Sequence, residues 1–263
     1  MSAIIRITLK GIFRDRIFQG ILVTALFFLA IPGVASLSMR QVTELSLTLS
    51  LSLLSFIMLL LAVFLGGTSL WKDIERRYTY SVLGLPLSRQ SYLLGRFFGV
   101  AFFMLLATVV LGLATAAVVA FTSGAYPPER PIVWTNVAAC VLFTALKYIM
   151  LVAIAFLFSS LSTSFFLPIF GTLAALLSGG VTQQVYEYLQ SPAGGELPLL
   201  VRNAATGLYY LLPNFSAFDL NANAIYGLPL SLSELAFSAA YCVVYTGIML
   251  SCASVIFLRR EMR

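Results

Sequence analysis

The chain has 263 residues, of which 60% are hydrophobic and only 10% are charged. Soluble domains carry about a quarter charged residues, and disordered chains combine low hydrophobicity with high charge, so both classes are excluded. No histidine occurs, which excludes Ser-His-Asp catalysis and histidine ligation of metal or haem. Several apolar runs reach the about 20 residues that a membrane-crossing helix needs. These features predict an all-α integral membrane protein.

The N-terminal residues 1–16 are predicted to form an amphipathic helix that lies in the membrane interface. Basic residues recur every four positions on one helical face and aliphatic residues lie on the other: Arg6, Lys10 and Arg14, against Ile5, Leu9 and Ile12. A basic face opposite an apolar face is typical of interfacial helices.

Six apolar segments follow, each long enough to cross a bilayer. They are 17–37, 45–70, 97–121, 135–158, 165–186 and 235–258. The basic start, the first apolar run and Val34-Ala35-Ser36 loosely fit a signal peptide, but we favour a retained span. The whole chain, 1–263, is thus predicted to be a single transmembrane domain with six transmembrane helices.

The placement of Lys and Arg predicts the orientation. With a cytoplasmic N-terminus and six spans, twelve of the 16 Lys and Arg residues fall in cytoplasmic segments. Only Arg40, Arg130 and Arg202 fall outside, and Lys147 lies within the fourth span. Because cytoplasmic loops are enriched in Lys and Arg, both termini are predicted to be cytoplasmic. With this hydropathy, the net charge of +6 indicates loops facing anionic lipid of the bilayer, not nucleic acid.

The cytoplasmic stretch between the second and third spans, 66–99, is the most informative. It reads GGTSLWKDIERRYTYSVLGLPLSRQSYLLGRFFG. Ser88 can cap a new helix, and Gly95 and Gly99 open the third span with GxxxG spacing. Charge runs more often mark a solvated loop, but here charged and apolar residues alternate. That alternation favours a short helix that docks into a groove of a cytosolic partner.

This stretch resembles the cytoplasmic signature of ABC-2-type permeases, the membrane subunits of a class of ABC exporters. The family pattern has an acid, a Glu-Arg pair, and a short helix ending in a leucine-rich turn with Pro-x-Ser-Arg. An aliphatic pair and Gly-Lys or Gly-Arg follow. The matching residues are Asp73, Glu75, Arg76, Leu83, Pro86, Ser88, Arg89, Leu93, Leu94, Gly95 and Arg96. The sequence departs from the pattern at Tyr78-Thr79-Tyr80, where family members often have a glycine-threonine pair.

The resemblance implies a permease subunit that forms the translocation path and pairs with a second copy or a paralogue. Two cytosolic ABC ATPase subunits would bind the pair. Segment 72–96 would contain the coupling helix, with these residues at the ATPase contact: Asp73, Glu75, Arg76, Arg77, Leu83, Leu85, Pro86, Ser88 and Arg89. The outer loop, 187–234, would form short re-entrant or interfacial helices. The expected location is the inner (plasma) membrane of a bacterium or archaeon.

The chain itself carries no ATPase motif. A P-loop needs Gly immediately before Lys, whereas the three lysines follow Leu9, Trp71 and Leu146. Residues 177–180, Leu-Ser-Gly-Gly, resemble the start of an ABC ATPase signature but lie in an apolar span, so they predict close packing by small residues. We therefore expect no enzymatic activity and no cofactor in this chain. ATP and Mg would be bound by the partner ATPase.

Lys147 lies near the middle of the fourth span, where a charge is costly. It either faces the translocation path, pairs with an acid at a dimer seam, or snorkels along its stem to the interface. The alternative function is a six-span secondary transporter or channel without an ATPase. Such carriers often show internal repeats and midplane acids, and the sequence has neither in the predicted spans. A membrane enzyme is disfavoured by the missing histidine and by acids confined to span ends.

Overall fold

The computed structural model describes residues 2–13, 20, 23–37, 41–70, 88–128, 130–162, 164–192 and 198–259. Within these residues the chain forms helices and turns, with no strand. The elements are α1 (Ser2–Phe13), η1 (Leu26–Ala30), α3 (Ile31–Ala35), α4 (Val42–Leu61), η2 (Ala62–Gly66), α7 (Arg89–Ala125), α8 (Trp134–Leu161), α9 (Phe166–Gln190), α10 (Leu199–Leu211), η4 (Ser216–Phe218), α11 (Asn221–Tyr226) and α12 (Leu232–Arg259).

Five helical segments of the described chain are long and apolar enough to cross a membrane. They are Val42–Leu70, which joins α4 to η2, and the helices α7, α8, α9 and α12. They confirm the positions of the second to sixth predicted spans, and the chain is a multi-pass membrane protein. The first predicted span, 17–37, is described only in part, so the six-span count remains a prediction.

Helix α7 is much longer than the predicted third span. It has 37 residues and begins at Arg89, eight residues before the predicted span at 97–121 and directly after Ser88, the predicted helix cap. A helix of this length extends about 55 Å, against about 30 Å for the hydrocarbon core. Hydropathy detects only the apolar part of a helix, and the polar first two turns continue the same helix outside that layer.

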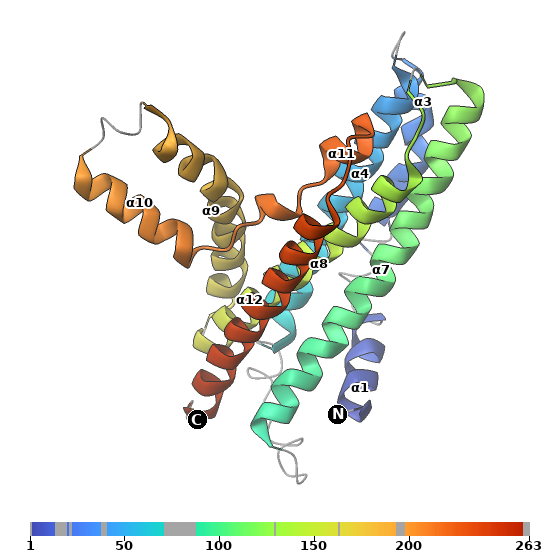
Figure 1. Ribbon diagram of the computed structural model, residues 1–263. Coiled ribbons are helices and arrows are strands. Elements are labelled where there is room, and N and C mark those ends of the chain that lie inside the picture. Colours follow the sequence, from blue (N-terminus) through green and yellow to red (C-terminus); the bar gives the residue numbers. More distant parts are fainter. Residues whose placement is uncertain are drawn as a thin grey trace.

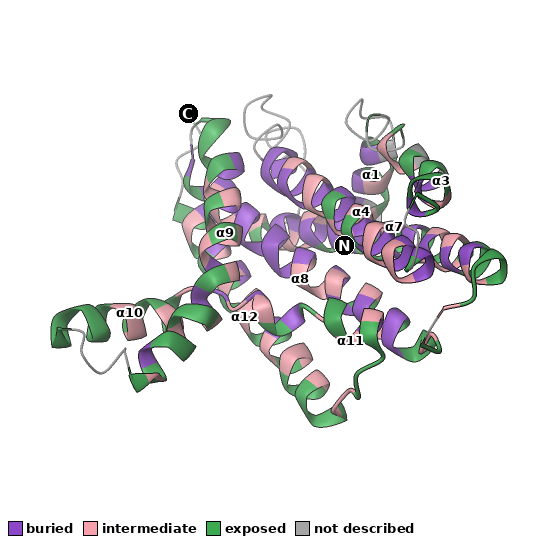
Figure 2. Ribbon diagram, turned by 90° about the horizontal axis from the view of Figure 1, so that it is seen from above, coloured by how far each residue is buried: buried purple, intermediate pink, exposed green. Residues whose placement is uncertain are grey.

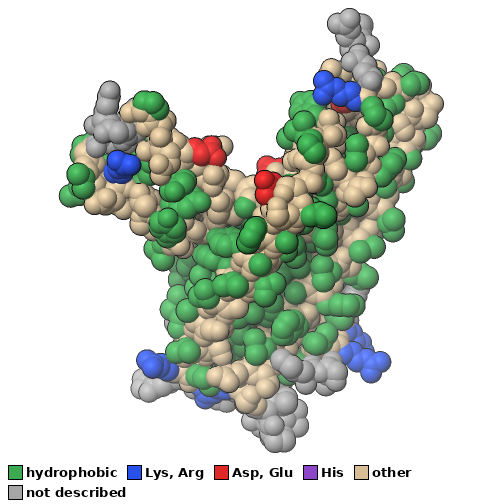
Figure 3. All heavy atoms as spheres, in the orientation of Figure 1, with side chains coloured by type: hydrophobic (Ala, Val, Ile, Leu, Met, Phe, Trp, Pro, Cys, Tyr) green, Lys and Arg blue, Asp and Glu red, His purple; other side chains and the backbone are tan. Residues whose placement is uncertain are grey.

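The two ends of the bundle differ in charge. Figure 1 places α1, the start of α7 and the end of α12 at one end, together with both described termini, and α3 at the other. We call the first the basic end, because α1, the first turns of α7 and the last turn of α12 carry Lys and Arg: Arg6, Lys10, Arg89, Arg96 and Arg259. The Asp and Glu side chains visible in Figure 3 lie toward the opposite end, around a hollow between two diverging arms.

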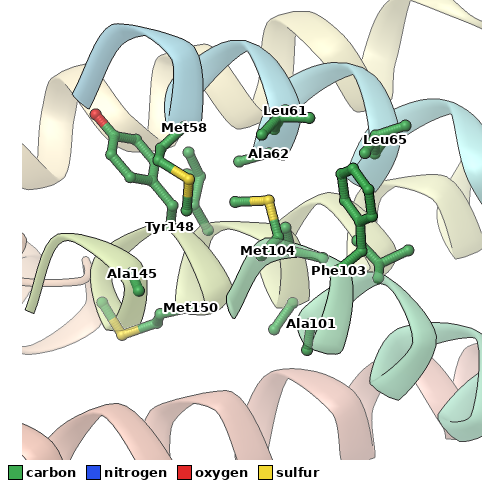
Figure 4. Packing of buried hydrophobic residues seen from close by; sticks show 14 of the residues in the cluster. Met58, Leu61, Ala62, Leu65, Ala101, Phe103, Met104, Ala145, Tyr148 and Met150 are labelled. Carbon is green, nitrogen blue, oxygen red and sulfur yellow. The ribbon is translucent and has the colours of Figure 1, made fainter. Parts of the chain in front are cut away.

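Helices α4 and α8 form the centre of the bundle. In the most apolar stretch of Val42–Leu70 and of α8, 56% is buried inside the bundle, whereas in α12 only 22% is buried. Helix α12 therefore presents most of its surface outward. Figure 2 shows the same contrast between enclosed and outer helices. In Figure 4, Met58 and Leu61 of α4 meet Met104 of α7 and Tyr148 of α8.

Small residues bring these helices close together. A Cβ placed on Gly66 would lie 3.0 Å from the Ala155 Cβ, and one on Gly112 would lie 2.9 Å from a Val141 methyl carbon. Lipid tails are as apolar as leucine, so helix association in a membrane depends on close packing and interhelical hydrogen bonds. The glycines provide the close packing, because they let the backbones of neighbouring helices approach each other.

Candidate functional site

The predicted ATPase-coupling residues fall into two groups. Most lie outside the described residues: Asp73, Glu75, Arg76, Arg77, Leu83, Leu85 and Pro86. Ser88 and Arg89 are described, as are the helical ends that flank this segment. The described part of the candidate site therefore consists of those flanking ends.

Ser88 is the N-cap of α7, as predicted. Its backbone is extended (φ −70°, ψ 145°), and its Oγ accepts a hydrogen bond from the Ser91 backbone N–H at 3.2 Å. Such a cap satisfies one of the backbone N–H groups that the first turn of a helix leaves unpaired. Helix α7 therefore begins at a defined residue, within the predicted coupling segment 72–96.

Helix α1 packs against the first turns of α7. A Cβ on Gly95 would lie 3.1 Å from Ile4, and one on Gly99 would lie 2.7 Å from the Thr8 Cβ. The GxxxG pair therefore forms a groove that receives side chains spaced four residues apart. The apolar face was predicted as Ile5, Leu9 and Ile12, but the buried positions of α1 are Ile4, Thr8 and Ile12, because this groove selects that row.

Arg96 lies between the two glycines of this groove and bonds to two other segments. Its Nη1 donates to the Thr8 hydroxyl of α1 at 3.1 Å, and its Nη2 donates to the Ser69 carbonyl at 3.5 Å. Ser69 is in the last described turn of Val42–Leu70. One guanidinium thus joins α1, the second span and α7.

Arg89 makes a comparable contact to the last span. Its Nη1 donates to the Leu258 carbonyl, 3.3 Å away, in the last turn of α12. Carbonyls in the last turn of a helix lack intrahelical partners and carry partial negative charge, so a cation there is stabilising. The first two turns of α7 therefore contact two other membrane-crossing helices at the basic end.

The second span is a π-helix over η2, just before it reaches this region. π-helical turns within α-helices are frequent at functional sites. Here the turn packs on α8, where the Ser159 hydroxyl donates to the Gly67 carbonyl at 3.0 Å. A Cβ on Gly67 would touch Pro168 of α9 at 3.5 Å, so the same turn also lies against α9.

Lys147 is half-buried on α8, and its Nζ lies 5.6 Å from the centre of the Tyr148 ring. Asp219 lies directly after η4. Phe218, the neighbour of Asp219, packs on Phe143 with ring centres 6.3 Å apart. Phe143 is one turn before Lys147 on α8. The contact that holds Phe218 therefore brings a negative charge toward Lys147.

The segment that contains η4 is inserted between α8, α9 and α12. The Phe215 backbone N–H donates to the Gly179 carbonyl at 3.1 Å, and the Ser216 hydroxyl donates to the Gly180 carbonyl at 2.9 Å. The Tyr241 hydroxyl of α12 accepts from the Asn214 N–H at 3.0 Å. Gly179 and Gly180 lie midway along α9, so the segment reaches well inside the bundle. Backbone that is not helical is tolerated at membrane depth where it is buried in protein or lines a water-filled cavity.

Gly179 of the Leu-Ser-Gly-Gly stretch serves close packing, whereas a Cβ on Gly180 would have no neighbour within 4 Å. A Cβ on Gly179 would collide with the Pro213 carbonyl oxygen and lie 2.7 Å from the Phe215 ring. The partner of this glycine is the inserted segment, whereas the sequence suggested another helix. No group of three or more His, Cys, Asp or Glu side chains that could hold a metal occurs in the described part of the chain.

Sequence reasoning missed the role of Thr8 and gave Arg96 none beyond its place in the motif. The signal that was available is the pair of glycines on either side of Arg96, with an N-terminal helix long enough to occupy their groove. The acceptor at Ser69 carries no sequence signal, because any residue has a backbone carbonyl there.

One protein-family model matches the part of the sequence that forms most of this bundle. The sequence model of a family described as ABC-2 family transporter protein matches residues 10–199. That range covers α4 to α9, the predicted coupling segment and Lys147. The comparison with curated proteins gave no match.

Proposed function

The chain belongs to the ABC-2 family of transporter proteins, and we propose that it is the transmembrane permease subunit of an ATP-binding cassette exporter. It forms the translocation path and couples to separate ATPase subunits. The family match carries this proposal. Five apolar membrane-length helices accompany it, and Gly does not precede any Lys, as a P-loop would require.

The topology we propose has six spans with both termini in the cytoplasm. Figure 1 supports an even number of crossings, since α1 lies at the basic end, α3 at the opposite end, and the end of α12 again at the basic end. Segment 17–37 is then the first span and α1 lies in the interface. The excess of Lys and Arg at the basic end favours a cytoplasmic location for that end.

The site we propose for ATPase contact is segment 72–96. Leu83, Leu85 and Pro86 would enter the ATPase groove, and Glu75 with Arg76 or Arg77 would brace the helix at the membrane. Asp73, Ser88 and Arg89 complete the assignment. The cap at Ser88 and the bond from Arg89 to α12 support it, because they anchor these two residues of the segment to α7 and α12.

The complex we propose contains two permease chains, identical or paralogous, and two ABC ATPase subunits in an inner (plasma) membrane. Association with ABC ATPases is general in the family. ATP and Mg would be bound by those subunits, and this chain would hold no cofactor. The segment around η4 would cap the translocation path on the outer side.

The test is purification of the tagged chain from its native membranes in mild detergent. We expect a protein with a Walker A motif to copurify in equal amount, identified by mass spectrometry, and the intact complex to have the mass of two subunits of each kind. Recovery of the chain without any ATPase would support the alternative, a secondary transporter or channel.

A second test addresses the coupling segment within that complex. Glu75→Ala and Arg89→Glu are expected to lower ATP hydrolysis that depends on the permease, since the first removes the brace and the second reverses a charge at a helix end. Glu187→Ala, at the other end of the molecule, is the control. Unchanged hydrolysis in both coupling variants would remove the assignment of this segment.

A further inference from the structure

Four segments meet at the basic end around two arginines of α7. Arg96 bonds to α1 through Thr8 and to the second span through Ser69. Arg89 bonds to the last turn of α12. In the sequence, segment 71–87 lies between Ser69 and Arg89, so the described residues that flank it on both sides belong to this junction.

The link between α1 and the second span depends on Arg96. Helix α1 packs mainly on α7, held in the groove of Gly95 and Gly99. Arg96 adds the bond from Thr8 across to Ser69. Only a planar guanidinium offers several donors in a fixed fork, so a lysine reaches one of these acceptors at a time.

We propose that Arg96 is the positioning residue that transmits motion of segment 71–87 to the membrane helices. By holding α1, the second span and α7 together, it makes a displacement of the segment move these three helices as a unit. Coupling between distant sites needs such a contiguous network of packed and bonded groups. This role rests on the proposed function, since the motion would come from ATPase subunits.

The network has a second member that can be altered more gently than Arg96. Thr8 is fully buried, and its hydroxyl both donates to the Ile4 carbonyl at 2.8 Å and accepts from Arg96. Thr8→Val keeps the shape and removes the acceptor. Thr8→Ser keeps the acceptor and removes a methyl group, so the two variants separate bonding from packing.

The experiment uses the complex of the chain with its copurified ATPase, reconstituted in lipid vesicles. We measure ATP hydrolysis relative to the ATPase alone, the subunit ratio, and the thermal unfolding midpoint of the complex. Arg96→Gln and Thr8→Val each break the charged bond between Arg96 and Thr8, and each is expected to lower the permease-dependent hydrolysis at least about tenfold. The subunit ratio should stay near the wild-type value, and the midpoint should fall by only about 2–4 °C.

The controls test whether the bond itself matters. Thr8→Ser and Arg202→Gln, the latter on α10, should retain the wild-type hydrolysis, and Arg96→Lys should be intermediate. The double variant Thr8→Val with Arg96→Gln should be no worse than Arg96→Gln alone, because both remove the same bond.

Three results would overturn the proposal. Wild-type hydrolysis in Arg96→Gln or Thr8→Val would remove the coupling role alone. Equal losses of midpoint, subunit ratio and hydrolysis in Thr8→Val and Thr8→Ser would make the junction merely structural. Absence of any ATPase from the wild-type preparation would refute the proposed function, and the coupling role with it.

Discussion

Gly179 determines how closely the inserted segment approaches α9. The Pro213 carbonyl and the Phe215 ring occupy the space where a side chain would begin. The same segment bonds to the Gly179 and Gly180 carbonyls. The missing side chain is therefore required for a contact between parts of the chain that are more than thirty residues apart.

Gly179→Ala is expected to lower the thermal unfolding midpoint in detergent. Its Cβ would press on backbone that is bonded on both sides, and overpacking of this kind costs about 1–3 kcal/mol. Gly180→Ala is the matched control, since nothing lies within 4 Å of its Cβ and alanine favours helix by about 1 kcal/mol. Equal midpoints in the two variants would contradict this account of the packing.

Lys147 is the second residue whose environment the fold defines. A helical side chain leans toward the N-terminus of its helix. For α8 this direction leads away from the basic end, toward the turn of Phe143, on which Phe218, the neighbour of Asp219, packs. This geometry accommodates a stem that snorkels in that direction. Whether Lys147 also faces the translocation path stays a prediction.

Lys147→Met is expected to leave the midpoint at or above the wild-type value. The methionine keeps the stem and removes a charge whose cost near the bilayer centre is about 3 kcal/mol on insertion scales. Thermal unfolding of the purified chain checks this. If Lys147→Met and Asp219→Asn each lower the midpoint and the double variant adds nothing further, the two charges are a stabilising pair.

At the scale of elements, α4 and α8 are joined by polar contacts as well as by packing. The Ser55 hydroxyl and the Tyr148 hydroxyl lie 2.8 Å apart, within hydrogen-bond distance. Tyr148 is otherwise buried in the core (Figure 4). The Ser159 bond to Gly67 lies nearer the basic end of the same pair of segments. The two contacts fix the register of the second span on α8.

A double-mutant cycle of Ser55→Ala and Tyr148→Phe should reveal this contact. Interhelical hydrogen bonds in membranes average about 0.6 kcal/mol and reach about 1.7 kcal/mol, so we expect a coupling energy in that range. Reversible unfolding in mixed micelles measures it. Strict additivity of the two substitutions would show that the hydroxyl pair contributes nothing to helix association.

At the scale of the whole molecule, charge separates the two ends of the bundle. Arg6, Lys10 and Arg259 belong to the basic end. Arg202 is on α10 and Arg130 is in the turn between α7 and α8, and both of these elements lie toward the other end (Figure 1). If the positive-inside rule applies, the basic end faces the cytoplasm. The hollow between the two arms (Figure 3) then opens outward.

This orientation predicts which cysteines react in intact cells. In a background with Cys140, Cys242 and Cys252 replaced by serine, Arg202→Cys should be labelled by a membrane-impermeant maleimide. Lys10→Cys should be labelled only after the membrane is opened. The opposite pattern would reverse the topology, and labelling of both in intact cells would contradict the six-span arrangement.

The sequence by itself determined the class of the protein, the place of five spans and the cap at Ser88. These depend on local composition: an apolar run of sufficient length must leave water, and a serine before a helix satisfies its first N–H groups. The family resemblance also came from a contiguous stretch, 72–96, and the comparison with families agrees with it. The sequence did not predict that one helix, α7, runs from this cap through the whole third span, because hydropathy does not register polar helical turns.

Only the tertiary structure decided which side chains meet. The row of α1 that is buried depends on the groove of Gly95 and Gly99, and the bonds of Arg96 depend on where Ser69 arrives. The insertion at Gly179 needs the segment 213–216 from more than thirty residues away. Such contacts join residues far apart in the chain, many through backbone carbonyls that every residue has. The pair of Gly95 and Gly99 indicates a groove, but composition and spacing do not show which side chains enter it.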